Sequence, residues 1–563
     1  MAIATASSLT KRFFGHCFGA EAKWRESTPK KEERMGEIVT NRRPVPGAFA
    51  CVVAAIGAIF VSTFNAAQSL PPEVPRTEPA APVAGWRFTP EISVTESFSD
   101  NAALAPSATA KKSWITEYTP GIRIEQRGVR STVFLDYRLH HFRYIDDSRL
   151  DNSQRLLTSY ATVEAIDRWL FVDASANITQ QNRSAFSIAG ATNASGPNGN
   201  RVETATNQIS PYIRGRVADI AAYQLRVVGA DIRSNDAALP HTKGRQWTGF
   251  IKNEHVTSGF GWSVDGNALS FRNEIVGKSY DERIRGLLSY EIDPQIHISA
   301  IGGRESSNFA SGRNDRANTS GIGLEWSPST RTQFAAVKEK RFFGDSHSIS
   351  FSHRTALSAW KLSSTRDLTA LSGQLTATGA GTTAGLLSDL LASAILDPVA
   401  REAAVRQKLE ESGVSANSAS SGGFATGRPF LIRSDEASVA LRGVYNTVTL
   451  SFSRRDQRRL GPAIGGTDSF SLSNDIRQQG VNLNWIYRMS PLSSVSLVAT
   501  SLRSEGLSTT GLDANQRSLN LLFSTRIGLH TFATFGARHV QFDNLLNTSY
   551  RENAVLGSVS LRY

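Results

Sequence analysis

The sequence predicts an all-β protein: a transmembrane, antiparallel outer-membrane β-barrel of about 22 strands, within a range of roughly 16 to 22, with one helical insertion. Three observations carry this prediction. Segments of about ten residues alternate apolar and polar side chains along most of the chain. The connections between them alternate between short turns and longer polar loops. The chain then ends in an alternating segment whose last residue, Tyr563, is aromatic.

Composition limits the ways in which the chain can cross a membrane. It has 563 residues, a formal net charge of +12, 40% hydrophobic residues and a mean hydropathy of −0.25. This is too polar for a bundle of membrane helices, each of which needs about 20 consecutive apolar residues. One run, at 47–64, approaches that length, follows Arg42 and Arg43 and precedes small residues. It predicts a cleaved secretory signal peptide, with a single membrane anchor as the alternative.

The domain boundaries follow from this signal and from the composition after it. Cleavage is expected near Ala67, and Met35 would give the signal a more usual start than Met1. The expected parts are an N-terminal extension with the signal peptide (1–67), a Pro-rich periplasmic linker (68–85), the barrel (86–563) and, within it, a helical loop insertion (369–429).

Cysteine use and charge agree with export. Cys17 and Cys51 both precede the expected cleavage point, so the mature chain has no disulfide and no cysteine metal site. Residues 68–563 hold 53 basic and 45 acidic side chains, a net charge of +8. This bias indicates contact with anionic lipid headgroups or an acidic polymer, although it serves solubility equally well. No Lys/Arg run indicates nucleic acid.

The early segments show two distinct faces. In 113–126, Trp114, Tyr118 and two isoleucines share one face, and in 131–144 the apolar face is formed by Val133, Leu135, Tyr137 and Leu139. A barrel in lipid turns such a face outward and its polar face toward a wet lumen. These residues either set solute preference or pair with each other and fill space. The candidate lumen-facing residues are Glu117, Arg123, Glu125, Asp136, Arg138 and His140.

The connections fix the expected orientation. Tight turns are expected at 127–128, 167–168, 293–294, 327–330 and 529–530, which is typical of periplasmic turns. An even strand number returns both ends of the barrel to that side. A soluble β-sandwich is the alternative, but about 22 strands packed as two sheets have no natural limit, whereas a barrel closes on itself. Aromatic residues at segment ends are expected to form interface girdles: Trp86, Trp114, Trp169, Trp326 and Tyr563.

The last segment, ENAVLGSVSLRY, explains why the chain ends in mid-strand. A final strand with alternating apolar residues and a terminal aromatic is a signal for the outer-membrane assembly machinery, and it must also pair with the first strand to close the barrel. The residues of this assembly signal are Val555, Val559, Leu561 and Tyr563.

One segment breaks the alternating pattern. Leucines at 386, 387, 390 and 391, with Ile395, recur at helical spacing. Asp397 is then expected to cap a second helix that starts at Pro398 and ends before Gly413. By strand count the insertion leaves from the outer side. The sequence favours an extracellular helical cap; the alternative is a gate or plug that folds into the lumen.

Signs of catalysis are missing from the sequence. It has no HExxH, no GxSxG, and no close pair of histidines that could share a metal, because His140 and His141 face opposite sides of a strand. The motif VGKSYD lacks the first glycine of a phosphate-binding loop, since Arg272 stands there. The sequence therefore predicts no enzyme, no catalytic residue, no cofactor and no metal.

Two stretches resemble a known family. WRFTPEISVTESFSDNAAL and SWITEYTPGIRIEQRGVRSTVFLDYRLHHFRY resemble the start of outer-membrane proteins associated with the PEP-CTERM protein-sorting and exopolysaccharide system. The marks are a Ser99-Asp100-Asn101 triplet and a turn at Thr119-Pro120-Gly121, and the helical insertion is similar too. Asp100 and Asn101 have an equally good structural explanation, as residues that end a strand and start a loop.

The resemblance implies a barrel in the outer membrane of a Gram-negative bacterium that assists polysaccharide export, and it carries over no catalytic residues. The alternatives are a general or solute-selective porin and a surface structural or adhesion barrel with a blocked lumen. The expected partners are outer-membrane lipid and lipopolysaccharide, the assembly machinery and exopolysaccharide, with no nucleic acid.

Overall fold

The computed structural model describes residues 85–563 apart from 188–199, 219, 237–238, 254–258, 311, 370–386, 389–390, 392–397, 412–422, 462–467 and 545–548. The predicted signal peptide, the alternative start at Met35 and nearly all of the linker lie outside the described residues. So do Leu386, Leu390, Ile395, Asp397 and Gly413 of the insertion.

The described chain is a succession of 22 strands with few helices. The first half contains β1 (Gly85–Ser99), β2 (Ser113–Arg127), β3 (Ser131–Tyr144), β4 (Asn152–Ile166), β5 (Leu170–Asn182), β6 (Arg201–Val217), β7 (Ala221–Ser234), β8 (Thr242–Asn253), β9 (Phe260–Asn273), β10 (Gly277–Asp293) and β11 (Ile296–Ser307). The second half contains β12 (Asp315–Ser329), β13 (Thr332–Arg341), β14 (Gly344–Arg354), β15 (Ser358–Thr369), β16 (Phe430–Arg442), β17 (Asn446–Arg459), β18 (Asp475–Arg488), β19 (Ser493–Gly506), β20 (Asp513–Arg526), β21 (Thr531–Asn544) and β22 (Tyr550–Arg562). The helices are the short 3₁₀ turns η1 (Ser107–Thr109) and η2 (Ser148–Leu150), together with α5 (Pro398–Glu411) and α6 (Ser469–Leu472).

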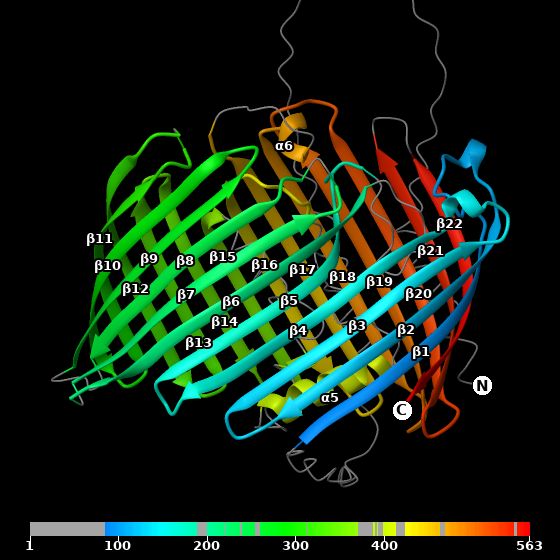
Figure 1. Cartoon of the computed structure of the whole chain (residues 1–563), viewed down its shortest axis with the longest axis horizontal. Coiled ribbons are helices and arrows are strands. Elements are labelled where there is room, and N and C mark those ends of the chain that lie inside the picture. Colours follow the sequence, from blue (N-terminus) through cyan, green and yellow to red (C-terminus); the bar gives the residue numbers. More distant parts are fainter. Residues whose placement is uncertain are drawn as a thin grey trace, which may run out of the picture. The chain divides into compact units, whose positions relative to one another are not determined.

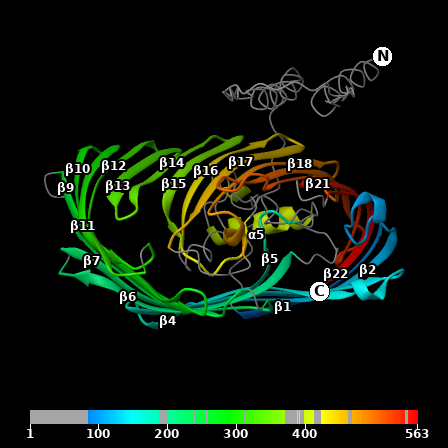
Figure 2. The same cartoon turned by 90° about the horizontal axis from the view of Figure 1, so that it is seen from above.

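The strands form one closed antiparallel barrel, as predicted. Each strand pairs with its sequence neighbours, and β1 closes the ring by pairing with β22 from Glu91–Arg562 to Ser99–Ala554. Figures 1 and 2 show the closed ring from the side and from above. Closure gives every described strand a neighbour on both sides, so the sheet has no free edge strand.

The connections differ between the two ends of the barrel. Those that follow even-numbered strands are short, from two residues after β10 to six after β8, and they include all five predicted turns (Figure 1). We call this the turn end, which in outer-membrane barrels faces the periplasm. Most connections at the opposite, loop end are longer. The tight hairpins β9–β10 and β13–β14 are exceptions there, and Gly277 (φ 69°) and Gly344 (φ 100°) supply the positive φ that such turns require.

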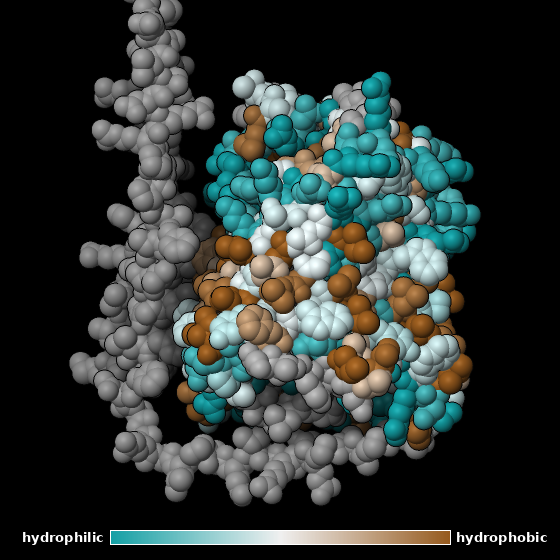
Figure 3. Space-filling view, turned by 90° about the vertical axis from the view of Figure 1, so that its left-hand side faces the viewer, coloured by the Kyte–Doolittle hydropathy of each residue, from teal (hydrophilic) through white to brown (hydrophobic). Residues whose placement is uncertain are grey.

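The outer surface carries an apolar belt. Large apolar side chains at alternate strand positions are exposed there, for example Ile284 (58%) and Ile322 (69%). Figure 3 shows brown residues across the middle of one face and teal residues above them. Exposed apolar surface of this extent is stable only against lipid. Among the predicted girdle residues, Trp86, Trp169, Trp326 and Tyr563 lie at the turn end and Trp114 at the loop end, and all five are exposed.

The insertion between β15 and β16 lies inside the barrel, which corrects the extracellular cap that the sequence favoured. Helix α5 begins at Pro398, as predicted, and in Figure 2 it lies within the ring of strands. Its side chains contact wall residues near the turn end, such as Glu125 at the end of β2 and Thr447 at the start of β17. Strand β15 ends at the loop end, so α5 lies near the opposite end of the lumen from the point where the insertion begins. Residues 423–429 return to the loop end, where Phe424 bridges to Asn182 of β5. Among the described residues, no helix has the length and apolar character needed to cross a membrane.

Candidate functional site: a plugged, polar lumen

Three of the six candidate lumen residues join one chain of ion pairs on β1–β3. Arg123 donates to Asp136 (2.9 Å), and Arg138 lies 3.2 Å from the same carboxylate. Arg138 also approaches Glu91 of β1 (3.5 Å), which accepts a hydrogen bond from Arg562 of β22 (3.2 Å). The chain therefore crosses the seam where the barrel closes. Its charges neutralise each other, which is the space-filling arrangement that the sequence left open.

Two further candidates form a separate pair one step toward the loop end. Nδ1 of His140 lies 2.6 Å from Oε1 of Glu117 and 3.2 Å from the hydroxyl of Thr119. Both side chains are about four-fifths covered. Sequence reasoning identified the residues because they alternate with apolar ones, but their partners depend on strand register, which the alternation does not reveal.

The remaining candidate, Glu125, binds the insertion. Arg406 of α5 donates to its carboxylate at 2.9 Å, and the guanidinium also lies 4.4 Å from the centre of the Phe134 ring. Two residues further along α5, the ammonium of Lys408 donates to the Thr447 hydroxyl at 3.0 Å. Helix α5 is thus held on two sides of the barrel, by β2–β3 and by β17.

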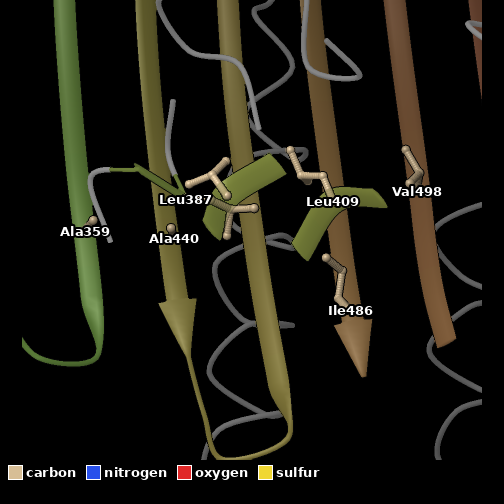
Figure 4. Close-up of a cluster of buried hydrophobic side chains, with 7 residues drawn as sticks. Ala359, Leu387, Leu409, Ala440, Ile486 and Val498 are labelled. Atoms are coloured by element: carbon tan, nitrogen blue, oxygen red, sulfur yellow. The ribbon is translucent and has the colours of Figure 1, made fainter. Parts of the chain in front are cut away.

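An apolar cluster fixes the insertion against the wall. Leu387, Val405 and Leu409 of the insertion are 1–3% exposed. They pack on four inward-facing wall residues, Ala359 of β15, Ala440 of β16, Ile486 of β18 and Val498 of β19 (Figure 4). Burying a leucine is worth about 1.5–3 kcal/mol, so these few side chains dominate the docking energy of the described part of the insertion.

The wall around that cluster is polar, although much of it is buried. Side chains that share the inner face with Ala440 and Ile486 are mostly hydroxyls and amides, and several are buried, such as Thr449 (3%), Asn484 (1%) and Ser496 (0%). Neither the Nδ2 nor the Oδ1 of Asn484 has a hydrogen-bond partner among the described residues. Burying such an amide unpaired costs about 1–3 kcal/mol, so the wall is chemically suited to contact with water or a polar solute. The inner-face hydroxyl and amide residues of β16–β20 are Ser434, Ser438, Thr447, Thr449, Ser451, Ser453, Gln457, Gln478, Asn482, Asn484, Ser494, Ser496, Thr500, Ser504, Gln516, Ser518, Asn520 and Ser524.

A second group of inner-face charges, on β9–β15, was missed by the sequence analysis. Arg285 bonds Asp265 at 3.0 Å and also Glu339. Arg341 and Glu305, only 3% and 0% exposed, pair at 2.9 Å, and Arg341 also contacts Asp367. The available signal was the same alternation, for example in VKEKR at 337–341, where Glu339 and Arg341 share the face opposite the two lysines. Here too the charges are paired with each other.

The family-like residues serve the barrel seam. Ser99 donates to Glu552 (2.9 Å), which also binds Arg538 (2.6 Å). The Asp100 carboxylate accepts the backbone N–H of Asn553 (2.7 Å). Asn101 is 1% exposed and donates to the carbonyl oxygens of Ala105 and Arg551. These contacts hold the first loop against β22.

Pro120 and Gly121 lie within β2 and do not form the predicted turn. Pro120 has no N–H for the ladder, and its side chain faces outward beside the apolar belt. A Cβ at Gly121 would lie 3.1 Å from the Tyr137 carbonyl oxygen and 3.2 Å from Cγ of Arg138. A side chain at this position would therefore push β3 or the Arg138 side chain aside by a few tenths of an ångström.

The four residues of the predicted assembly signal share the outer face of β22. Val555, Val559 and Tyr563 are 55%, 47% and 72% exposed. In the closing pairs, Val559 stands opposite Val94 and Leu561 opposite Ile92. The C-terminal strand thus continues the apolar belt across the seam.

The described residues contain no group of three or more His, Asp, Glu or Cys side chains that could hold a metal ion. No family profile matches the sequence, and no curated protein matches it.

Solved structures with a similar barrel include an iron transporter and siderophore receptors. The FrpB iron transporter of Neisseria meningitidis (F5-1 variant, apoprotein) is 10% identical, with a TM-score of 0.45 over 84% of this chain and 81% of that one. The siderophore receptor PirA from Pseudomonas aeruginosa is 9% identical, with a TM-score of 0.37 over 85% and 80%. BauA, the ferric preacinetobactin receptor of Acinetobacter baumannii, is 10% identical, with a TM-score of 0.40 over 85% and 81%. At these identities the likeness concerns the barrel alone.

Proposed function

We propose that this protein is an outer-membrane channel for exopolysaccharide, gated by the insertion between β15 and β16. The observation that carries the proposal is the buried polar wall beneath the insertion, with the unpaired amide of Asn484 next to Val498 in the pairing register. A permanent plug would favour apolar or fully bonded side chains at such a contact. A gate needs a wall that tolerates contact with the docked insertion in the closed state and contact with water and solute in the open state.

The chemistry of the lumen favours a polyhydroxylated solute. Hydroxyl and amide side chains both donate and accept hydrogen bonds, so they match sugar hydroxyls in many orientations. The inner-face carboxylates and guanidinium groups described above are engaged with each other, which reduces their attraction for free ions. A neutral or weakly charged saccharide chain fits this wall better than a small ion does.

The strength of docking suits a reversible gate. The apolar cluster involves three side chains of the insertion, and the Arg406–Glu125 pair is partly exposed, with 24% and 30% of the two side chains accessible. Pairs of that exposure contribute about 0–1 kcal/mol. The docking free energy of the described part of the insertion is small enough that binding of a periplasmic partner, or of the polymer itself, could displace it.

Export through a cleaved signal, insertion by the assembly machinery and residence in a Gram-negative outer membrane belong to the same proposal. They rest on the sequence pattern at 47–64, the outward apolar face of β22 and the apolar outer belt. The choice of exopolysaccharide as the polymer rests on the sequence resemblance to the family associated with the PEP-CTERM and exopolysaccharide system. No enzymatic step is required of the barrel.

The position of the insertion also favours a second candidate, a structural or adhesion barrel whose lumen stays blocked. Conductance separates the two: a gated channel shows openings in a planar bilayer, whereas a permanently blocked barrel shows none. A general porin, the other alternative, would conduct without any need to displace the insertion.

The decisive experiment measures polymer in cells that lack the gene. Exopolysaccharide is quantified separately in the medium and in the periplasm, in the deletion strain and after complementation. We expect polymer to disappear from the medium, to accumulate in the periplasm, and to return to the medium on complementation. Unchanged secretion would refute the export proposal.

A further inference from the structure

The outer face of β8–β12 is hollowed in two places. A cavity of about 800 Å³ lies among Trp247, Gly249, Gly266, Ile284 and Arg304. A second hollow of about 430 Å³ continues toward the membrane midplane beside Trp262, Gly286 and Gly302. Both are on the lipid side, because the neighbours of Ile284 in sequence, Arg283 and Arg285, turn inward to Glu339.

Glycines open this groove. Gly249 pairs with Gly266, and one step lower Gly286 pairs with Gly302. A Cβ on Gly302 would meet no atom within 4 Å, so a side chain there would project into the hollow. The apolar walls are Trp262, Ile284 and Leu288, which are 39%, 58% and 57% exposed. The result is a shallow apolar track that descends from the loop end.

Cations gather at the upper end of that track. Lys243, Arg272 and Lys278 stand side by side on β8, β9 and β10, in direct cross-strand pairs. Arg304 and Arg316 lie on neighbouring strands at the cavity itself. All five are exposed, and none has a side-chain ion pair or hydrogen bond with another described residue. Like charges placed directly opposite destabilise a sheet, so this arrangement needs an anion.

Elsewhere on the outer face, three arginines at the same end of the strands are neutralised. Arg433 pairs with Asp435 (3.0 Å), Arg458 with Asp475 (3.7 Å) and Arg503 with Asp513 (3.0 Å). Two acids line the cavity, Glu282 and Glu305, and the carboxylate of Glu305 is engaged with Arg341. Exposed cations on other strands, such as Arg143 and Arg517, also lack an ion pair with a described residue. What distinguishes β8–β12 is that three such cations stand in direct cross-strand pairs above a cavity. Figure 3 shows this side of the barrel, with its hydrophilic upper zone above the apolar belt.

We propose that this face binds lipid A, the acylated and doubly phosphorylated glycolipid of the outer leaflet. Arg and Lys are the side chains that bind phosphate oxygens, and basic pockets at the membrane surface hold anionic headgroups. Five strands span about 19 Å at 4.8 Å spacing, which is wider than a single phosphate can bridge and suits two phosphates on a disaccharide. An acyl chain then occupies the glycine track below.

Native mass spectrometry of the purified, folded barrel tests this site with three probes: bis-phosphorylated lipid A, its dephosphorylated form and phosphatidylglycerol. The wild type is expected to retain one bis-phosphorylated lipid A and at least tenfold less of the other two. The variant R272Q/K278Q/R304Q is expected to bind at least tenfold less lipid A. The matched control R433Q/R458Q/R503Q removes the same charge from the paired sites and is expected to bind like the wild type.

A second variant tests the track without changing charge. Gly302→Leu fills the lower hollow and is expected to lower lipid A occupancy severalfold, while heat-modifiable gel mobility confirms a folded barrel. Equal binding by the wild type and R272Q/K278Q/R304Q would overturn the proposal. So would equal retention of phosphatidylglycerol or of dephosphorylated lipid A, since the first would indicate a general anionic-lipid surface and the second a purely apolar one.

Discussion

Removing the two buried leucines of the insertion should open the channel. Leu387 and Leu409 are 1% and 2% exposed in the cluster that docks the insertion. Leu→Ala changes at buried sites cost about 2–5 kcal/mol. We take the lower value, because the insertion can adjust to the wall. Each change then shifts the docking equilibrium by roughly 30-fold, and the pair by about a thousandfold, since 1.4 kcal/mol is a factor of ten.

Planar-bilayer conductance of the purified barrel provides the assay. The wild type should be mostly closed, L409A should open more often, and L387A/L409A should be open most of the time. Arg406→Ala should have a smaller effect, about fivefold, because it loses a partly exposed ion pair and a cation–π contact worth about 1 kcal/mol together.

A matched control separates gating from general destabilisation. Leu269 is a buried inner-face leucine (7% exposed) that packs with Phe271 and Phe309, away from the cluster that docks the insertion. L269A should lower stability by a comparable amount and leave conductance unchanged. If L387A/L409A conducts no more than the wild type or L269A, the insertion is not the gate.

Three further predictions concern stability and assembly. Glu305→Ala should lower the free energy of unfolding in urea by about 3 kcal/mol, because the buried Arg341 loses one of its two carboxylate partners and keeps Asp367; a loss below 1 kcal/mol would contradict this. Asn484→Leu should instead raise it by about 1 kcal/mol, because a buried amide without a partner is removed, and a loss of stability would mean that the amide is bonded. Tyr563→Ala should reduce the amount of folded barrel in the outer membrane severalfold, as measured by heat-modifiable gel mobility. The control is Val129→Ala, which changes an exposed residue in the turn between β2 and β3. Equal amounts of the two folded variants would rule out an assembly role for the terminal ring.

The barrel could be predicted from the sequence because the direction of each side chain in a strand depends only on its neighbours in the chain. Side chains alternate with a period of two, so the face of each residue, such as Glu117 or Asp136, follows from its neighbours. The hairpin turns follow from short polar breaks, and the strand number follows from counting them. Closure by β22 follows from its apolar outward residues.

Partners and the path of the insertion could not be predicted, because they depend on distant parts of the chain. Glu125 and Arg406 are 281 residues apart, and nothing in the spacing of α5 shows which surface Val405 and Leu409 cover. The sequence favoured an extracellular cap because the insertion leaves the barrel at the loop end, which faces solvent. Docking inside the lumen is favoured instead by apolar wall residues, Ala440 and Ile486, which come together only when the barrel has formed. The unpaired cations of β8–β12 likewise become apparent only when register sets Arg272 beside Lys278.

Gating by the insertion is tested most directly by a cross-link that holds the insertion against the wall. Glu125→Cys and Arg406→Cys replace the two ends of the 2.9 Å ion pair, and the natural cysteines, Cys17 and Cys51, lie in the N-terminal part. A short thiol-reactive cross-linker that reductant cleaves then ties α5 to β2 in living cells. Exopolysaccharide release into the medium should stop when the tether forms and resume when it is reduced. Release that continues with the tether intact would contradict a channel gated by this insertion.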